Sequence, residues 1–228
     1  MILKAVLFDL DGTLLDTAAD FTTVLNTLLQ QHGRPTVDYH RVRQTVSDGA
    51  RAVVSMGFEQ DMESPGFDSL LQSFLDAYAQ HLAVGTTLFP GMAEQLTEIE
   101  NRGMQWGIVT NKPARFTEPL LEALELQQRC ATAICPDHVS NRKPHPEPIY
   151  LACQQLGVHP RNAIYLGDHR RDIDAGRNAG MATVACRYGY IHDGDNIENW
   201  GADYIIDRAD DLTALMNQLA TPETSTHP

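Results

Sequence analysis

Two carboxylates stand two positions apart in the segment VLFDLDGTLLD, which covers residues 6–16. Asp9 and Asp11 directly follow a run of apolar residues. An ionised carboxylate is costly to bury unless a cation, a shared proton or open solvent accompanies it. Paired acids of this kind can bind a metal ion, attack an electrophile or exchange a proton with a substrate. Which of these three chemistries applies depends on the residues that lie beside Asp9 and Asp11 in the folded protein.

Polar residues also follow three later segments that have the pattern of strands. They lie in VTNKP (109–113), NRKPHPEP (141–148) and GDHRRD (167–172). Because the carboxyl ends of parallel strands meet at one edge of a sheet, we expect these residues to converge there. The expected set holds four acids, one base and two neutral hydrogen-bonding groups: Asp9, Asp11, Thr110, Asn111, Lys143, Asp168 and Asp172.

The acids of this set suit a magnesium ion. Mg²⁺ prefers carboxylate oxygens, keeps several waters and accepts oxygen from a phosphate. We predict Asp9 and Asp168 as direct ligands, with Asp172 one helical turn beyond Asp168. The metal lets clustered acids stay ionised and lets Asp9 approach an anion as a nucleophile. Asp11 is placed to protonate a leaving group and afterwards to deprotonate water.

The other members of the set can bind phosphate oxygens. Lys143 supplies compact positive charge for both Asp9 and the phosphoryl group. Thr110, Asn111 and the backbone amides of the Gly12 turn can donate hydrogen bonds to the same oxygens. The whole set therefore predicts metal-assisted hydrolysis of a phosphomonoester.

Alternating strands and helices must hold these residues in place. This alternation is typical of βαβ units with a parallel sheet covered on both faces, so the sequence predicts an α/β fold. The expected strands are Ala5–Phe8, 106–109, 131–134, 163–166, 183–185 and Tyr204–Ile206. The expected helices are 16–32, Met92–Asn101, 113–124, Glu147–Leu156, 171–179 and 210–219.

A helical insertion separates the first strand from the rest of this sheet. Residues 18–84 show only helical patterns, a domain-sized excursion of about 65 residues that leaves just after Asp11. We therefore expect a helical cap over the carboxyl edge, where α/β proteins bind ligands. The expected domains are a core of residues 1–16 and 86–220 and a cap of 17–85, with hinges near 12–17 and 85–90. Residues 221–228 read as a flexible tail.

The composition restricts the partners and the location. The 228 residues are 43% apolar and 21% charged, which fits a globular protein with a sizeable core. A net charge of −13 without a basic stripe argues against nucleic acid and against an anionic membrane surface. Four cysteines without a C-x-x-C pair indicate reduced thiols, and the N-terminal segment is too short and too soon charged for a signal peptide. We expect a cytoplasmic protein that acts on a small phosphate ester.

Four motifs in order resemble those of the haloacid dehalogenase superfamily of phosphatases. DLDGT, VTN, RKP and GDHRRD match them along essentially the whole chain. The resemblance implies a Rossmann-like core with an α-helical cap, an aspartyl-phosphate on Asp9 and acid/base work by Asp11. It also implies Mg²⁺ bound by Asp9, the Asp11 carbonyl and Asp168, with Asp172 in support. His169 stands where relatives often have a small hydroxyl residue, so the local hydrogen bonding can differ.

Within the superfamily the chain resembles the phosphoglycolate phosphatase group, through DGTLLDTAADF, LFPGM, VTNKP, KPHPEP and DIDAGRNAGM. A narrower similarity is to the N-acetylmuramic acid 6-phosphate phosphatases of bacterial peptidoglycan recycling. It lies in TNKPARFTEPL, ICPDHV and RYGYIHDGDNIENWGAD. The resemblance implies N-acetylmuramic acid 6-phosphate as the first expected substrate and 2-phosphoglycolate as the alternative.

Three other functions compete with hydrolysis of a phosphate ester. A sugar phosphomutase would use the same site and a similar cap, and the sequence leaves it open. A dehalogenase is disfavoured because metal-free displacement at carbon has no use for a second acid at Asp11. A binding protein with an inactive site is disfavoured because all the expected catalytic groups are present.

Two further segments have residue types that suggest a functional role. In VSDGAR (46–51), Gly49 suggests a turn or a helix start that faces the site, and Arg51 could bind a substrate carboxylate through both of its terminal nitrogens. Both expected substrates carry such a carboxylate. RYGYIH (187–192) mixes aromatic and charged residues, but we expect a loop that packs on the sheet edge with half-buried tyrosines.

Overall fold

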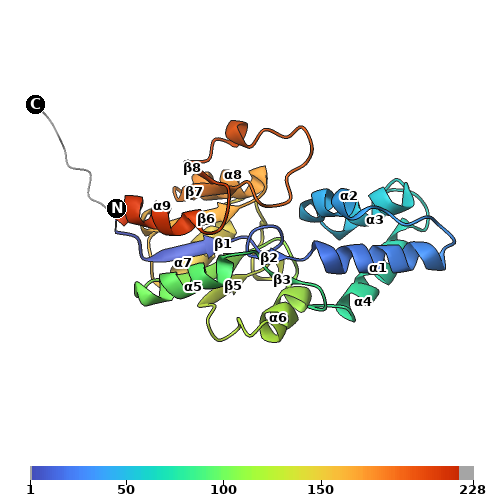
Figure 1. The fold of residues 1–228 in the computed structure, drawn as a ribbon, viewed down its shortest axis with the longest axis horizontal. Coiled ribbons are helices and arrows are strands. Elements are labelled where there is room, and N and C mark those ends of the chain that lie inside the picture. The colour runs from blue at the N-terminus through green and yellow to red at the C-terminus, as the bar shows by residue number, and fades with distance from the viewer. Residues whose placement is uncertain (1, 221–228) are drawn as a thin grey trace, which may run out of the picture.

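Six parallel strands form the central sheet of the protein, in a computed structural model that describes residues 2–220 (Figure 1). Their order across the sheet is β5-β4-β1-β6-β7-β8. The strands are β1 (Ala5–Phe8), β4 (Gln105–Val109), β5 (Thr132–Ile134), β6 (Ala163–Gly167), β7 (Ala182–Cys186) and β8 (Tyr204–Ile206). The parallel α/β fold expected from the sequence is confirmed, and the tail expected at 221–228 lies outside the described residues.

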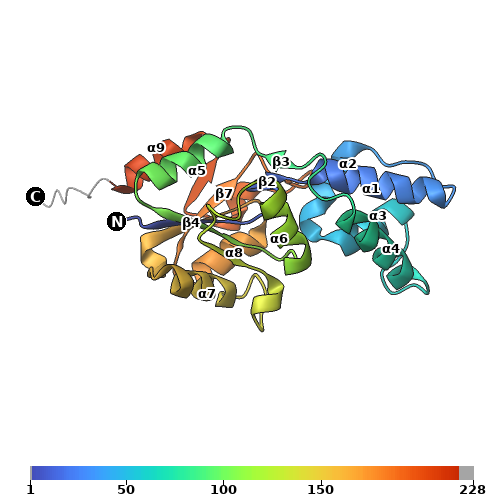
Figure 2. The same ribbon diagram turned by 90° about the horizontal axis from the view of Figure 1, so that it is seen from below.

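Helices cover both faces of the sheet, and the central strands β1 and β6 are buried on both of their sides. In β1, Val6 and Phe8 belong to one apolar cluster with residues of α5 (Met92–Asn101) and α9 (Asp211–Ala220). Ala5 and Leu7, on the opposite face, join residues of α7 (Glu147–Leu156) and α8 (Arg170–Asn178). Figure 2 shows these two helical layers on either side of the strands. Alternate residues of one strand thus build two separate cores.

The chain between β1 and β4 forms a group of helices beyond one end of the sheet (Figure 1). They are α1 (Ala18–Gln31), α2 (Tyr39–Thr45), a 3₁₀ turn (Val46–Asp48), α3 (Ala50–Phe58) and α4 (Phe67–Ala79). A two-stranded antiparallel ribbon, β2 (Leu15–Asp16) with β3 (Thr87–Leu88), joins the two connections between these helices and the sheet. The sequence did not predict this ribbon, because strands of two residues leave no periodic pattern.

Shorter elements complete the core around the sheet. Helix α6 (Ala114–Ala123) follows β4, and 3₁₀ turns lie at Pro136–His138, Pro160–Asn162 and Ile197–Trp200. The observed bounds of α5, α7 and β8 equal the expected ones, and most other ends shift by one or two residues, as helix and strand ends commonly do. No helix among residues 2–220 is long and apolar enough to cross a membrane.

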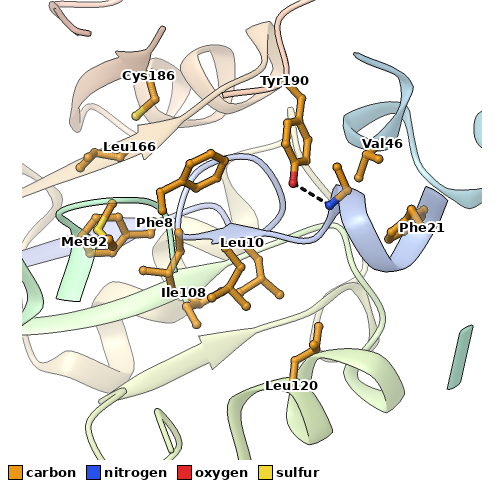
Figure 3. Close-up of a cluster of buried hydrophobic side chains, with 14 of the residues drawn as sticks. Phe8, Leu10, Phe21, Val46, Met92, Ile108, Leu120, Leu166, Cys186 and Tyr190 are labelled. Atoms are coloured by element: carbon orange, nitrogen blue, oxygen red, sulfur yellow. Dashed lines mark hydrogen bonds between the residues drawn. The ribbon is translucent and has the colours of Figure 1, made fainter. Parts of the chain in front are cut away.

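The helical insertion and the sheet share one apolar cluster. Phe8 and Ile108 of the sheet and Phe21 and Val46 of the insertion are all buried in it (Figure 3). In the same view the hydroxyl of Tyr190 points at the start of α1, where it accepts a hydrogen bond from the Ala18 amide. Each large apolar side chain buried in this way contributes about 1.5–3 kcal/mol. The observed cap position is therefore held by packing as well as by polar contacts.

Candidate active site

The predicted polar residues meet where the order of the strands reverses. The chain passes from β1 to β4 and β5 on one side, and then returns to β6, β7 and β8 on the other. Asp9, Thr110 and Asp168 each stand just beyond the carboxyl end of β1, β4 or β6. These three strands are neighbours, so their ends form the crevice in which open α/β sheets bind ligands.

Three carboxylates form the acidic centre of this crevice. One oxygen each of Asp9, Asp168 and Asp172 lies within 4.8 Å of the others. Burial raises the pKa of both Asp9 and Asp168, and the neighbouring carboxylates raise the two values further. Such a group stays ionised at neutral pH only beside positive charge. Its hard oxygen donors fit Mg²⁺, which would supply that charge and draw in a phosphate oxygen.

The Asp168 carboxylate is fixed from several directions. The Tyr190 amide donates to Oδ2 at 2.8 Å, the Ser47 hydroxyl donates to the same oxygen at 2.9 Å, and the Thr13 hydroxyl donates to Oδ1 at 3.3 Å. A Cβ added at Gly189 would lie 2.2 Å from the Asp168 Cβ, so the backbone passes too close for any side chain there. The sequence predicts a purely packing role for residues 187–192, and the structure adds this direct support of the acidic centre.

Lys143 is the cation of the acidic centre. Its Nζ lies 2.8 Å from Asp9 Oδ1 and 2.7 Å from Asp172 Oδ1, and it donates to the Val109 carbonyl and the Tyr165 hydroxyl. Burial disfavours the charged ammonium, but Asp172 and Asp9 outweigh it and raise the pKa of Lys143. Lys143 therefore orients Asp9, and Asp172 lies beside Lys143 as well as near Asp168.

Thr110 and Asn111 lie at the edge of the same crevice. The Thr110 hydroxyl accepts a hydrogen bond from the Lys112 amide at 3.1 Å. The Asn111 side chain donates to the Lys143 carbonyl at 3.1 Å, and its Oδ1 is buried without a partner among the described residues. Both residues line the cavity described below, so both can reach a ligand bound over Asp9.

Asp11 faces the side of the crevice that is nearer to the helical cap. The Thr17 hydroxyl donates to Asp11 Oδ1 at 2.7 Å. Lys112, for which the sequence predicted no role, forms an ion pair with the same oxygen at 3.0 Å. The signal available in the sequence was a lysine directly after Thr110 and Asn111, in the polar segment that follows a strand.

A cavity of about 580 Å³ lies between the sheet edge and the helical cap. Asp9, Asp11 and Lys143 line it from the core, and Phe21, Leu71 and Leu75 give it an apolar wall from the cap. Other lining residues carry charge or polar atoms: Ser47, Asp48, Arg51, Thr110, Asn111, Lys112, Arg115, Arg142, His169 and Arg171.

Arg51 lines the cavity but is anchored within the cap. Its guanidinium forms an ion pair with Asp68 at 3.1 Å and donates to the Met62 carbonyl at 3.1 Å. It also lies over the ring of Phe67, 5.1 Å from the centroid. Gly49, with φ of +91°, starts the helix that carries Arg51, as the sequence suggested. Arg51 thus reaches the cavity from a fixed position on the cap.

Asp48 of the cap meets three cationic or ionisable side chains of the core. It lies 2.7 Å from His192 Nε2, 3.3 Å from the Arg171 guanidinium and 3.5 Å from His169 Nε2. The hydrogen bond from His169 and the contact with His192 lower the pKa of Asp48 to about 2 against partial burial. No sequence pattern indicated this cluster, because Asp48 lies more than 120 residues from each of its three partners.

An acidic centre at the carboxyl edge of a parallel sheet, beneath inserted helices, defines a class of hydrolases. Residues 6–186 match the family model of the haloacid dehalogenase-like hydrolases, and the chain belongs to this family. An N-acetylmuramic acid 6-phosphate phosphatase of Pseudomonas putida is 49% identical over 217 residues, covering 95% of this chain and 97% of the relative. A phosphoglycolate phosphatase of Xanthomonas campestris pv. campestris is 39% identical, covering 92% and 94%.

The fold has a close match among solved structures. The crystal structure of a predicted phosphoglycolate phosphatase from Haemophilus somnus aligns with a TM-score of 0.83 at 26% identity, covering 95% of this chain and 99% of that one. Family and relatives together make this protein a phosphatase. The resemblance expected from its motifs, to the superfamily and to both groups of phosphatases, is confirmed.

Proposed function

We propose that this phosphatase hydrolyses N-acetylmuramic acid 6-phosphate in a Mg²⁺-dependent reaction that passes through an aspartyl-phosphate. The observation that carries the choice of substrate is the cavity of about 580 Å³ above Asp9. A two-carbon acid phosphate would fill a small part of it, and would leave the apolar wall of Phe21, Leu71 and Leu75 without contact. An amino sugar with a lactyl ether and an acetyl group supplies both the bulk and the apolar surface.

The residues of the crevice take the following roles in this reaction. Asp9 attacks phosphorus and carries the phosphoryl group, while Asp11 protonates the sugar oxygen and then deprotonates the attacking water. Lys143 neutralises charge on Asp9 and on the phosphoryl oxygens. Thr110 and Asn111 hold those oxygens in place.

The acidic centre holds the metal in this proposal. Asp9, Asp168 and the Asp11 carbonyl are the ligands, and Asp172 supports them beside Lys143. The metal supplies positive charge that lets an anionic nucleophile approach an anionic ester. The closeness of Asp9, Asp168 and Asp172 supports this assignment.

Cations at the mouth of the cavity can receive the lactyl carboxylate. Arg115 and Arg142 both line the cavity, and neither forms an ion pair with another described residue. Arg51 lines the same cavity from the cap. An arginine can bind a carboxylate through two parallel hydrogen bonds, which adds orientation to attraction. This supports a substrate whose carboxylate lies away from its phosphate.

The test is phosphate release with Mg²⁺ from N-acetylmuramic acid 6-phosphate, N-acetylglucosamine 6-phosphate and 2-phosphoglycolate. We expect the highest kcat/KM with the first, because the second lacks the lactyl group and the third lacks the sugar. A preference for 2-phosphoglycolate would replace the proposal with clearance of a two-carbon acid phosphate. Low net release that a sugar bisphosphate activates would instead indicate a phosphomutase.

The proposed substrate places the enzyme in the recycling of cell-wall sugars inside the cell. All four cysteines are free, and Cys135, Cys153 and Cys186 are buried. Free thiols persist in a reducing compartment, which supports a cytoplasmic location. Fractionation of cells that express the tagged chain tests this location.

A further inference from the structure

Lys112 is a buried cation that the roles assigned above do not use. Its side chain is 5% exposed, at the end of the polar segment that follows β4. Its Nζ lies 3.0 Å from Asp11 Oδ1 and 3.3 Å from Asp11 Oδ2, and it donates to the Tyr78 hydroxyl at 2.9 Å. Among the ion pairs of the described residues, Lys112 has Asp11 as its one carboxylate partner. A buried ammonium is costly without such a partner, so the contact fixes both side chains.

The second partner of Lys112 belongs to the cap. Tyr78 is 1% exposed and lies in α4, the last helix of the insertion. The Lys112 Nζ also lies 4.7 Å from the centroid of the Tyr78 ring and 5.0 Å from that of Phe21, which is in α1. Both rings come from the cap, so they enclose the ammonium only while the cap is docked on the core. Lys112 therefore joins a core carboxylate to two cap helices.

The Asp11 carboxylate is held on one side by these contacts. Its Oδ1 accepts hydrogen bonds from the Thr17 hydroxyl at 2.7 Å and from the Lys112 ammonium at 3.0 Å. Among the described residues, Oδ2 has one hydrogen-bond contact, the longer one with Lys112 at 3.3 Å, and Asp11 lines the cavity. Oδ2 is thus the oxygen that remains for a ligand. A general acid displaced by about 1 Å can lose a hundredfold in rate, so this orientation matters for catalysis.

We propose that Lys112 is a positioning residue which, together with Tyr78 of the cap, aims the Asp11 carboxylate at the leaving oxygen of the substrate once the cap has closed. The proposal rests on the acid/base role of Asp11 in the proposed function, and not on the identity of the sugar. Lys112 makes no contact with the reacting atoms in this role. It acts through the orientation of Asp11, and Tyr78 makes that orientation depend on the cap.

The test compares two leaving groups. An alkyl phosphate releases a basic alkoxide that needs a proton, whereas p-nitrophenyl phosphate releases a stable nitrophenolate that needs none. The ratio kcat/KM reports the steps up to the departure of the leaving group, so hydrolysis of the phosphoenzyme does not enter it. Both substrates are assayed with wild type, Lys112→Met, Lys112→Arg, Tyr78→Phe and Asp11→Asn. Asp11→Asn is the reference, because it shows how kcat/KM for each substrate changes when the acid itself is lost.

We expect Lys112→Met to lower kcat/KM about tenfold or more for N-acetylmuramic acid 6-phosphate. For p-nitrophenyl phosphate we expect a change of less than about threefold. Lys112→Arg should recover part of the loss, because it keeps the charge near Asp11. Tyr78→Phe should lower kcat/KM more for the alkyl phosphate than for p-nitrophenyl phosphate, as Lys112→Met does. In a double variant that combines Lys112→Met with Tyr78→Phe, the fall in kcat/KM should be smaller than the product of the two single falls.

Equal losses on both substrates would show that Lys112 only stabilises the fold, and no loss on either would remove it from the mechanism. If Lys112→Met does not fold, Tyr78→Phe still decides, because it removes one hydroxyl and leaves the buried lysine in place. If wild type does not hydrolyse N-acetylmuramic acid 6-phosphate, the choice of sugar fails. The comparison then proceeds with 2-phosphoglycolate, which is also an alkyl phosphate.

Discussion

The side-chain hydroxyl of Ser47, in the cap, donates a hydrogen bond of 2.9 Å to Oδ2 of Asp168, in the core. The next residue, Asp48, contacts His169, Arg171 and His192 on the same side of the core. One 3₁₀ turn of the cap, Val46–Asp48, thus touches the acidic centre and the basic side chains beside it. The position of the cap and the geometry of the acidic centre are therefore linked through two adjacent residues.

The contacts of Asp48 should stabilise the protein in a pH-dependent way. The pKa of Asp48 is lowered from 3.8 to about 2 in the folded protein. A carboxyl whose pKa is lowered on folding contributes stability above its unfolded pKa, and that contribution is lost as the pH falls through the folded value. Because Asp48 is partly exposed, solvent screening reduces its contribution to about 1 kcal/mol. Asp48→Asn should therefore lower the unfolding free energy by about this amount at pH 7.

Urea unfolding at several pH values checks this prediction. The difference between wild type and Asp48→Asn should persist from pH 7 to pH 4 and shrink below pH 4. Asp193→Asn is the matched control, because Asp193 is exposed in the segment next to His192 and forms no ion pair with another described residue. A constant difference down to pH 3 would contradict the linkage.

Asp9→Asn should abolish turnover and leave the fold intact. The amide keeps the shape of the side chain, and Lys143 keeps Asp172 as its carboxylate partner, so the unfolding temperature should change little. The nucleophile is lost, and turnover should fall by about three orders of magnitude or more. Phosphate release and circular dichroism measure the two effects. Mass spectrometry of acid-quenched enzyme should find phosphate on the Asp9 peptide of wild type alone, and turnover that survives the change would exclude Asp9 as nucleophile.

The strands and helices of the sheet could be predicted from the sequence because each has a hydrophobic pattern within its own segment. Short apolar runs such as Ala5–Phe8 are buried on both faces, and the helices between them show clear apolar faces, so α5 and α7 were placed to the residue. The ribbon of β2 and β3 was not predicted. Each of its strands has two residues, and its pairing joins Leu15 to Leu88 across the whole cap. Such a pairing depends on how the insertion folds back, which no local pattern records.

The residues of the site also fall into a predictable group and a group that the sequence could not predict. Asp9, Asp168 and Lys143 were placed by the rule that the ends of parallel strands converge, and the structure brings their side chains together. Contacts between cap and core, such as Ser47 with Asp168, depend on how segments far apart in the sequence pack together. The pairing of Lys112 with Tyr78 is of this second kind. Sequence spacing alone carries no information about such docking.

Arg51→Ala should raise KM for a carboxylated substrate and leave kcat nearly unchanged. The guanidinium lines the cavity, and its contact with a carboxylate would serve the ground state and the transition state alike. We expect a rise of about fivefold to thirtyfold, as for one exposed charge-assisted contact.

The pairing of Arg51 with Asp68 supplies the matched control for this prediction. Asp68→Asn removes the ion pair within the cap but keeps the arginine at the cavity. If Arg51 binds substrate, Asp68→Asn should leave KM within about twofold of wild type. Equal rises of KM in the two variants would mean that Arg51 acts by holding the cap together, and an unchanged KM in Arg51→Ala would remove it from the site.

Binding of Mg²⁺ should release protons, and should release more of them at mildly acidic pH. Burial and the neighbouring Asp9 and Asp172 raise the pKa of Asp168 in the metal-free protein. A raised carboxyl pKa means that part of the population holds a proton at pH 6, and a dication can bind only after that proton leaves.

Titration calorimetry with MgCl₂ in two buffers of different ionisation enthalpy should show greater proton release at pH 6 than at pH 8. The affinity should weaken by at most about tenfold per pH unit as the pH falls, which is the limit for one proton. Asp168→Asn should abolish most of the release together with tight binding, whereas equal release at both pH values would separate metal binding from the buried carboxyl.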